Sequence, residues 1–384
     1  MTDAAGQHQI VLILDDDVMI TEGLAAGLAR SGRTVVTCND LESGEIVVEW
    51  LKPSHVLTDV RLTGTFGYEG LDFIRFVKRH SPDTRVILMT GDAPDALQFE
   101  ASQRGAVGFL RKPFEVSEVD AVLNLMAPAR VGSADWPDII RIPLLDDIVK
   151  SDCISTVFQP IVRLSSGDRV GYEALTRCRT DSPYRNPETL FTYAHRKHQI
   201  TELESACVQS AFASGERLAA SAALFVNVHP AVFSSGRAVR DIFTNAAKRH
   251  DIDLNRVVLE ITEQGSLSHD RKVIDAIHHL KETGIRFAFD DVGVAYSHLP
   301  FMDAVRPSFL KISQAFGTGF ELDQTKMKIV KNLLSLSADF NCELILEGVE
   351  TAATAAAAAD LGIKYAQGYY FAHPAAAETW IQAA

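Results

Sequence analysis

Short apolar runs alternate with helical patterns through the first third of the chain. The first run, at residues 10–14, is followed by Ile20, Leu24 and Leu28 at helical spacing, and Gly32 is a typical helix stop. The alternation repeats with apolar runs at 34–38, 55–58, 85–89 and 108–110. This order of strands and helices predicts an α/β domain at residues 8–127, built on a doubly wound, five-stranded parallel sheet.

The alternation stops after Met126, where small residues, Pro and Gly dominate residues 127–137. Such a composition is typical of a linker, so we predict a linker at 128–145 and a second domain at 146–384. In that domain strand-like runs return between helical segments such as 323–340. They lie at 170–172, 224–226, 257–259, 286–289, 309–310, 344–346 and 365–366. A stretch of about 250 residues with this alternation predicts a closed, TIM-like (β/α)8 barrel.

The composition is that of a globular protein with a negatively charged surface. Of the 384 residues 47% are hydrophobic, and the formal net charge is -13. Such a surface repels a phosphate backbone, so DNA is not an expected partner. The five cysteines are scattered without a C-x-x-C pair, which favours reduced thiols over disulfides or a zinc site. No secretory signal pattern and no apolar run of roughly 20 residues is present, so we expect a cytoplasmic protein with no membrane partner.

Polar side chains end the apolar runs of the second domain. They are Glu173, Asn227, Glu260, Asp290, Asp291, Lys311, Glu347 and Gln367. The carboxyl ends of barrel strands face one mouth, so we expect these side chains to converge there. Any one carboxylate could instead cap a helix or form an ion pair, but so many at one mouth need a cation to stabilise them. Oxygen ligands suit Mg²⁺ or Mn²⁺, and two such ions about 4 Å apart are a common arrangement for attack on a phosphodiester.

Eight ordered motifs in this region resemble those of the EAL domain. They are F-Q-P-I-V at 158–162, Y-E-A-L at 172–175 with Arg177, V-N-V at 226–228, L-E-I-T-E at 259–263, D-D at 290–291, K-I at 311–312, E-G-V-E-T at 347–351 and Q-G-Y-Y-F at 367–371. One E-A-L triplet has no weight as evidence, whereas the full set in order is specific. The resemblance implies a phosphodiesterase that opens the cyclic dinucleotide c-di-GMP to linear pGpG with two Mg²⁺ or Mn²⁺ ions.

The resemblance also implies a role for each matching residue. Glu173, Asn227, Glu260 and Asp290 would hold one metal ion. Asp290 would bridge to a second ion held with Asp291 and Glu347, and Lys311 would contact the attacking water. Lys311, Glu347 and Asp291 are thus the expected catalytic residues. The residues expected to contact the substrate or support the site are Gln159, Leu175, Arg177, Gln367, Glu263 and Glu350.

The chain departs from the family pattern at several positions. Residues 290–297 have the sequence D-D-V-G-V-A-Y-S where the family usually has D-D-F-G-T-G-Y-S. Ser313 stands where the family's K-I-D motif has a carboxylate. Cys178 and His229 replace the more usual Trp and Ser next to their motifs. These changes leave open whether the barrel hydrolyses its ligand or only binds it.

Polar residues also follow the strands of the first domain. Asp15 and Asp16 follow the first run, Asp59 the third, Thr90 the fourth and Lys112 the fifth. In a doubly wound sheet these strand ends share one crevice, where carboxylates, a hydroxyl and an amine can hold Mg²⁺ and accept a phosphoryl group. An alternative for the acidic run at 15–17 is a solvated helix start.

With Phe109, these residues resemble the receiver domain of two-component response regulators. The resemblance implies that a histidine kinase phosphorylates Asp59, that Asp15 and Asp16 hold Mg²⁺ with Asp59, and that Thr90 and Lys112 contact the phosphoryl oxygens. Phe109 would change rotamer with phosphorylation. The segment at 60–69 is longer than the family's usual loop and lacks its proline, which allows atypical phosphorylation kinetics.

The leading hypothesis is a response regulator whose receiver domain controls a c-di-GMP phosphodiesterase. Two alternatives stay open: a barrel that binds c-di-GMP without turnover, and an interaction scaffold that binds no nucleotide. Ser313 and the altered residues 292–295 favour the first alternative, while intact Glu173, Arg177 and Glu347 disfavour the second. The resemblance also implies a homo-oligomer.

Overall fold

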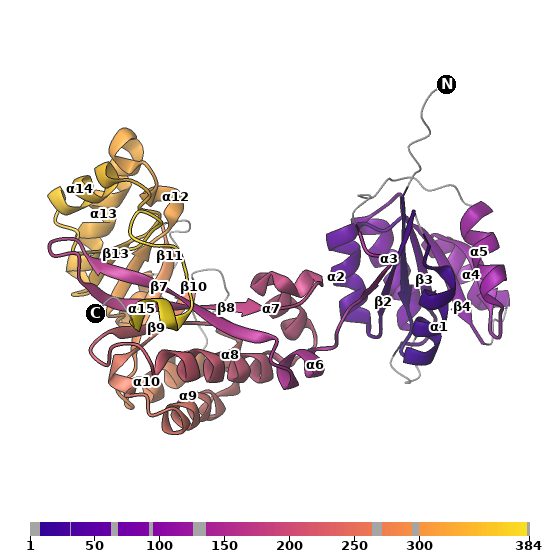
Figure 1. The fold of residues 1–384 in the computed structure, drawn as a ribbon, viewed down its shortest axis with the longest axis horizontal. Coiled ribbons are helices and arrows are strands. Elements are labelled where there is room, and N and C mark those ends of the chain that lie inside the picture. Colours follow the sequence, from indigo (N-terminus) through magenta and orange to yellow (C-terminus); the bar gives the residue numbers. More distant parts are fainter. Residues whose placement is uncertain are drawn as a thin grey trace. The chain divides into compact units, whose positions relative to one another are not determined.

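The computed structural model describes residues 8–30, 32–62, 68–91, 95–125, 136–262, 271–293 and 299–381. The chain folds into two compact units (Figure 1). The first comprises Met1–Ser151 and Arg179–Lys197, and the second comprises Asp152–Cys178 and His198–Ala384. Residues 179–197 therefore pack with the N-terminal unit, although the chain on both sides of them belongs to the other.

A parallel sheet flanked by helices forms the centre of the first unit and confirms the predicted doubly wound domain. Its strands are β1 (Gln9–Leu14), β2 (Arg33–Cys38), β3 (His55–Asp59), β4 (Arg85–Thr90), β5 (Ala106–Arg111) and β6 (Ile139–Arg141), in the order β5-β4-β3-β1-β2-β6. Strands β1 and β4 are buried on both faces, which is why each contains an uninterrupted apolar run. The prediction missed β6, whose three residues pair with β2 beyond the linker-like composition.

Side chains cap the starts of some helices of the first unit. The helices are α1 (Val18–Leu28), α2 (Leu41–Leu51), α3 (Glu69–His80), α4 (Asp95–Arg104), α5 (Val116–Leu125), α6 (Leu145–Lys150) and α7 (Pro187–Arg196), with a short 3-10 turn η1 (Pro183–Arg185) before α7. The carboxylates of Asp17 and Asp40 accept backbone hydrogen bonds at the starts of α1 and α2. Gly70 at the start of α3 lies so close to the Asp59 carbonyl that a Cβ there would collide with it. Glycine thus keeps α3 against the end of β3.

A closed barrel of eight strands forms the second unit and confirms the TIM-like architecture. The strands are β7 (Ile154–Arg163), β8 (Arg169–Cys178), β9 (Ala223–Val228), β10 (Val257–Thr262), β11 (Arg286–Val292), β12 (Phe309–Ile312), β13 (Glu343–Leu346) and β14 (Tyr365–Ala366). The prediction missed β7, which pairs antiparallel with both β8 and β14. The remaining pairs are parallel, so the carboxyl ends of β8 to β14 share one mouth.

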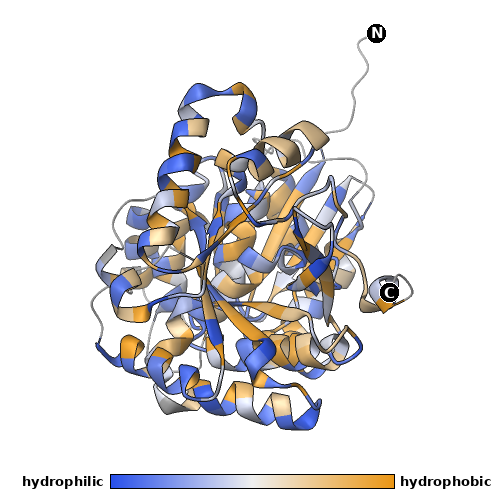
Figure 2. Ribbon diagram, turned by 90° about the vertical axis from the view of Figure 1, so that its left-hand side faces the viewer, coloured by the Kyte–Doolittle hydropathy of each residue, from blue (hydrophilic) through white to orange (hydrophobic). Residues whose placement is uncertain are grey.

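Helices surround this barrel and bury their apolar faces against it. They are α8 (Ile200–Gly215), α9 (Arg237–Arg249), α10 (Arg271–Lys281), α11 (Leu299–Val305), α12 (Gln314–Gly317), α13 (Gln324–Asp339), α14 (Ala352–Asp360) and α15 (Ala377–Ile381), with short turns η2 (Pro230–Ser235), η3 (Leu254–Arg256) and η4 (Phe320–Leu322). Figure 2 shows hydrophobic strands inside and hydrophilic outer faces on the helices. Within the described residues no helix has the length and apolar character to cross a membrane.

Candidate active site

The carboxyl ends of the barrel strands bring the predicted polar residues together. Glu173 lies on β8, Asn227 on β9, Glu260 on β10, Asp290 and Asp291 on β11 and Lys311 on β12, while Glu347 and Gln367 directly follow β13 and β14. We call these side chains the acidic site. Glu260 and Lys311 are fully buried, and Glu173 and Asp290 are nearly so. Convergence at one mouth, as the sequence predicted, is therefore what the fold produces.

Lys311 is the cationic centre of the acidic site. Its Nζ lies 2.8 Å from Glu260 Oε1 and 2.8 Å from Glu347 Oε1. Asp290 Oδ1 at 3.3 Å and Glu173 Oε2 at 3.4 Å complete the ring of carboxylates. Burial alone disfavours an ammonium ion, but these four anions raise the pKa of Lys311 well above its ordinary value. The lysine is thus held charged.

Three amide side chains orient Glu173. Asn227 Nδ2 donates to Glu173 Oε1 at 2.9 Å, and Gln367 Nε2 donates to Glu173 Oε2 at 2.6 Å. Gln367 also donates to Gln159 Oε1 at 3.0 Å, and Gln159 in turn donates to the Ala372 carbonyl at 3.2 Å. Burial would raise the pKa of Glu173, yet Lys311 and the amide donors outweigh it and lower the pKa. Glu173 is therefore a carboxylate at neutral pH.

A bulge in β11 lets two consecutive aspartates reach the same mouth. Successive residues of a regular strand point to opposite faces. Between Phe289 and Val292 the pairing of β11 with β12 shifts in register, and Asp291 has a left-handed φ of 55°. Its backbone N–H donates to Asp290 Oδ1 at 2.9 Å. Bulges and unusual backbone angles are common next to active sites because they redirect side chains.

The acidic site has more negative charge than Lys311 can balance. Burial, the first cause, raises the pKa of Glu347 to about 8 and that of Glu260 well above its usual range, although Lys311 opposes both shifts. Both Glu260 oxygens are buried, and among the described residues their one close partner is Lys311, which lies beside Oε1. A buried carboxylate without partners costs several kcal/mol. Five carboxylates around one amine therefore need further positive charge.

Two groups of oxygens in the acidic site are spaced for cations. In the first, oxygens of Glu173, Glu260 and Asp290 all lie within 4.8 Å of one another. In the second the same is true of Asp290, Asp291 and Glu347. Asp290 belongs to both, which fits a carboxylate shared by two ions. The unpaired oxygens and the all-oxygen donor set suit Mg²⁺ or Mn²⁺.

The other predicted residues of this domain lie around the acidic site or outside the described part of the chain. Leu175 and Arg177 follow Glu173 on β8 by two and four residues, so all three face the same side of the strand. Arg177 is exposed, and its Nη1 donates to the Thr176 carbonyl at 2.9 Å. Glu350 is exposed in the segment after β13. Glu263 and residues 294–298 lie outside the described residues.

A smaller aspartate site lies at the carboxyl ends of the strands in the first unit. Oxygens of Asp15, Asp16 and Asp59 lie within 4.8 Å of one another. Lys112 Nζ lies 2.6 Å from Asp15 Oδ2 and 3.4 Å from Asp59 Oδ1. Burial, together with the Asp15 charge, raises the pKa of Asp59 although Lys112 opposes the shift. Thr90 is buried at the end of β4, and Phe109 is half-buried on β5.

Sequence reasoning missed the residues that support the aspartate site from the α2 side. Asn39 Nδ2 donates to the Asp15 carbonyl at 2.8 Å and to Thr21 Oγ1 at 3.1 Å. The next residue, Asp40, accepts a hydrogen bond of 2.6 Å from the Tyr193 hydroxyl of α7. The position of Asn39 directly after the second strand was the available signal. Nothing in the sequence indicated that residues 179–197 pack on α2. Of the predicted loop at 60–69, the structure describes residues 60–62 and 68–69.

Comparisons with known proteins agree with this geometry. The EAL domain family matches residues 144–374, and the response regulator receiver domain family matches residues 11–124. A cyclic di-GMP phosphodiesterase of Pseudomonas aeruginosa, RocR, is 25% identical over 320 residues, which cover 80% of this chain and 81% of RocR.

Two further likenesses cover only the barrel region. An uncharacterized protein of Mycobacterium tuberculosis is 29% identical over 238 residues, or 60% of this chain, and the matched part spans only 38% of that protein's length. A solved structure described as the PaMucR phosphodiesterase in complex with c-di-GMP is 25% identical with a TM-score of 0.55. It covers 61% of this chain and 97% of the solved chain.

Proposed function

Because the chain belongs to the EAL domain family and carries an N-terminal receiver domain, we propose that it hydrolyses c-di-GMP to linear pGpG under the control of receiver phosphorylation. The observation that carries this proposal is the acidic site: five carboxylates, of which Asp290 belongs to both groups of oxygens, lie around one buried lysine. Neither protein packing nor hydrogen bonding explains so many buried anions. Two divalent cations bound among these carboxylates would balance their charge.

The residues that would hold the cations follow from the two groups of oxygens. Glu173, Asn227, Glu260 and Asp290 would hold one ion, and Asp290, Asp291 and Glu347 the other. When bound, the cations would lower the pKa of a water molecule and stabilise charge on the phosphodiester. Gln159 and Gln367 fix the orientation of Glu173 through hydrogen bonds. Such support keeps a ligand in place, and its loss commonly weakens metal binding by 10-fold to 100-fold, roughly.

Lys311 would position the attacking water between the two groups. Its ammonium has three protons and no other buried cation nearby among the described residues, so it can donate to a water oxygen as well as to Glu260 and Glu347. On β8, Leu175 and Arg177 share the face of Glu173 and extend beyond it. Arg177 is therefore suited to bind a substrate phosphate with its guanidinium group, and Leu175 to contact the substrate.

The first unit would regulate the barrel through Asp59. A sensor histidine kinase would phosphorylate this residue, with Mg²⁺ held by Asp15, Asp16 and Asp59. Lys112 already contacts Asp59 and would pair with the phosphoryl oxygens, as would Thr90 at the next strand end. Phe109 on the adjacent strand β5 would respond by changing its side-chain conformation.

A contiguous set of contacts supports this control. Asp15 accepts from Asn39, and the neighbouring Asp40 both caps α2 and accepts from Tyr193. Arg196, also on α7, lies 3.2 Å from Glu45 and 3.1 Å from Glu49 on α2. In the chain, α7 lies between β8, which carries Glu173, and α8 of the barrel. A shift of α2 on phosphorylation would therefore act on α7, which the chain connects to β8 and to α8.

One observation favours a second function, a barrel that binds c-di-GMP without turnover. Ser313 is buried directly after Lys311 and Ile312, where the family usually has a carboxylate. The loss of one anion beside Lys311 would weaken cation binding and leave a ligand-binding sensor. Homo-oligomerisation and the boundaries at 127 and 146 stay predictions.

Incubation of the purified chain with c-di-GMP tests the proposal. We expect pGpG as the product with Mg²⁺ or Mn²⁺, and none with EDTA, when the reaction is followed by anion-exchange chromatography. Absence of product with both metals, at an enzyme concentration equal to that of the substrate, would contradict catalysis. Calorimetric binding of c-di-GMP in that case would establish the sensor function instead.

A further inference from the structure

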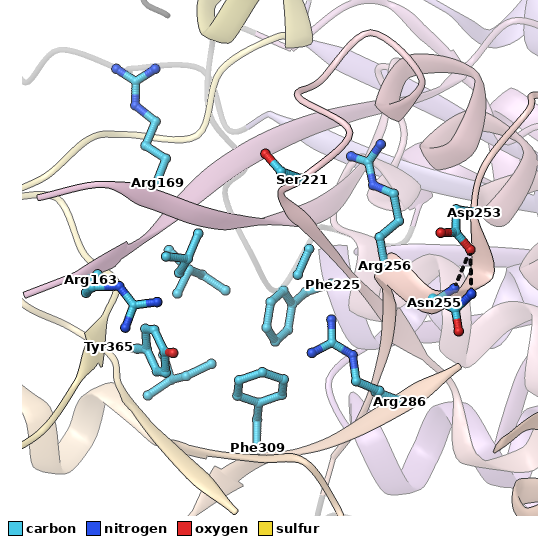
Figure 3. Close-up of a pocket in the computed structure, with 14 residues that line it drawn as sticks. Arg163, Arg169, Ser221, Phe225, Asp253, Asn255, Arg256, Arg286, Phe309 and Tyr365 are labelled. Carbon is cyan, nitrogen blue, oxygen red and sulfur yellow. Dashed lines mark hydrogen bonds between the residues drawn. The ribbon is translucent and has the colours of Figure 1, made fainter. Parts of the chain in front are cut away.

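A second concave site lies at the amino-terminal end of the barrel, opposite the acidic site. It is a pocket of about 510 Å³ (Figure 3). Its polar lining includes four arginines, Arg163, Arg169, Arg256 and Arg286, and its aromatic lining is Phe225, Phe309 and Tyr365. We call it the arginine pocket. A pocket of this size is in the range that binds small molecules, about 300 to 1000 Å³.

The strand period explains why the two ends of the barrel differ. On β7, Gln159, Ile161 and Arg163 lie two residues apart and so face the same interior. On β11 the same spacing gives Arg286, Ala288 and Asp290. In each strand a basic residue lies at the arginine pocket and an amide or carboxylate lies at the acidic site.

An apolar layer separates the two sites. Ile161, Phe225, Val258, Ala288 and Ile345 form a buried cluster across the barrel. Phe309 and Tyr365 pack against this cluster and line the arginine pocket as well. The pocket is therefore not a part of the acidic site seen from the other side, and a ligand in it would not reach the carboxylates.

The arginines differ in how they face the pocket. Arg163 and Arg286 point into it from opposite sides in Figure 3, beside the rings of Tyr365 and Phe309. Their guanidinium carbons lie 5.1 Å from the Tyr365 ring centre and 5.5 Å from that of Phe309. Arg169 instead places its guanidinium 5.4 Å from the Trp380 ring centre and points away from the pocket.

Donor groups of this pocket are buried without acceptors. Arg256 Nη2 and Arg286 Nε have no hydrogen-bond partner within the described part of the protein. Asp253 is the one acidic residue among those that line the pocket, and its Oδ1 already accepts from the Asn255 backbone and side chain at 2.9 and 2.8 Å. Burial lowers the pKa of both Arg256 and Arg286. The pocket thus concentrates positive charge in a protein whose net charge is -13.

A purely structural role explains only part of this arrangement. Arg256 Nε donates to the Ala222 carbonyl at 3.0 Å, which ties η3 to the start of β9. Stacking on Phe309 and Tyr365 also stabilises Arg286 and Arg163 to a modest degree. Arginines that serve stability alone are usually paired with carboxylates, and buried donors usually have acceptors. Among the described residues no carboxylate pairs with Arg163 or Arg286, and an anion in the pocket would supply that negative charge.

We propose that the arginine pocket binds a small phosphate-bearing anion, held by Arg163 and Arg286. The planar guanidinium group donates two parallel hydrogen bonds to phosphate oxygens, so several such groups around one cavity favour phosphate over a single carboxylate. Ser221 at the rim adds a hydroxyl donor, and the aromatic wall suits the organic part of a phosphorylated ligand. The site does not depend on the catalytic function of the acidic site.

Calorimetry with pyrophosphate as the probe tests this inference. The full chain is kept in EDTA without c-di-GMP, so that the negatively charged acidic site repels the probe. We expect saturable binding and a rise in Tm with pyrophosphate but not with sodium chloride of equal ionic strength, because a ligand that binds the folded state stabilises it. Inorganic phosphate and ATP then distinguish a bare phosphate site from a nucleotide site. Citrate that binds as tightly as pyrophosphate would contradict the preference for phosphate.

Matched variants locate the binding. The double variant Arg163→Gln/Arg286→Gln should weaken pyrophosphate binding at least tenfold. Arg169→Gln removes an arginine that lines the pocket but points away from it. We expect this variant to bind pyrophosphate with an affinity within threefold of that of the parent. Circular dichroism checks that each variant folds. Absence of binding and of a Tm shift in the parent chain at 10 mM pyrophosphate would overturn the proposal, as would parent-like affinity in a folded double variant.

Discussion

The acidic site of the barrel and the aspartate site of the first unit each combine carboxylates with one lysine at the carboxyl ends of parallel strands. The two sites differ in the number of carboxylates around the lysine and in how deeply the lysine is buried. In the aspartate site, Lys112 faces two of three carboxylates, and Asp16 is exposed. In the acidic site, Lys311 is fully buried and four carboxylates lie within 3.4 Å of its Nζ. Similar residue types at similar strand ends thus form an open site and a closed one.

The difference indicates what each site can do. A partly exposed aspartate beside one partly exposed lysine can accept a phosphoryl group from a partner protein and lose it again. An enclosed excess of carboxylates cannot remain ionised without cations, so it favours permanent metal binding. The same chemistry therefore fits a switch in one unit and a hydrolase in the other.

The largest effect should come from the shared ligand of the acidic site. Asp290→Asn removes the carboxylate common to both oxygen groups, and we expect turnover of c-di-GMP to fall by at least about a hundredfold. Asp339→Asn removes an exposed carboxylate on α13 and should leave turnover unchanged. Initial rates at saturating Mn²⁺ measure both variants. An Asp290→Asn rate within tenfold of the parent rate would contradict the proposed role of Asp290, because turnover would then not need the carboxylate common to both oxygen groups.

A smaller effect is expected from the aspartate site. Asp59→Asn removes the phosphoryl acceptor but keeps the side-chain shape, so hydrolysis should no longer change on addition of acetyl phosphate. Tyr193→Phe removes only the hydroxyl that donates to Asp40, and the response to acetyl phosphate should shrink while basal hydrolysis persists. Rates with and without acetyl phosphate test both. If acetyl phosphate changed the hydrolysis rate of Asp59→Asn as much as that of the parent, the aspartate site would not control hydrolysis.

Divalent cations should stabilise the barrel more than the receiver domain. Adding 5 mM Mg²⁺ to protein freed of metal should raise the Tm of the barrel transition by several degrees, because the ions bind only the folded carboxylate cluster. Glu260→Gln should reduce this rise, since it removes one carboxylate of the first oxygen group. Differential scanning calorimetry separates the transitions. An unchanged barrel Tm in the parent would contradict cation binding.

The last prediction concerns how stability depends on pH through Glu204, a buried carboxylate outside both sites. Among the described residues, Glu204 on α8 accepts one hydrogen bond, from the His229 backbone N–H at 3.4 Å, and burial raises its pKa to about 8 from 4.5. Between pH 4.5 and 8 the unfolded state loses this proton while the folded state keeps it, so stability falls as the pH rises through that window. Glu204→Gln should therefore gain roughly 2 to 4 kcal/mol relative to the parent between pH 5 and pH 8. Urea unfolding at both pH values measures the gain, and equal pH dependence in the two proteins would contradict the account.

Much of the fold followed from the sequence because apolar runs and polar strand ends are local patterns. The five strands of the receiver sheet and the gathering of Glu173, Glu260 and Asp290 are examples. Strands β6 and β7 escaped prediction for different reasons. The three residues of β6 are stabilised by pairing with β2, and β7 runs antiparallel in a barrel expected to be parallel.

Other features of the site depend on contacts that no local pattern records. The bulge at Asp290 and Asp291 arises from pairing with β12, and the contact of Tyr193 with Asp40 joins residues 153 positions apart. The arginine pocket likewise draws its residues from seven strands and the turn η3. Only the closed barrel brings them together.

Anomalous scattering from a crystal soaked in Mn²⁺ tests the central claim most directly. The account predicts two peaks at the barrel mouth, one among Glu173, Asn227, Glu260 and Asp290 and one among Asp290, Asp291 and Glu347. Carboxylates that keep their contacts to Lys311, with no peak among them at saturating Mn²⁺, would contradict it.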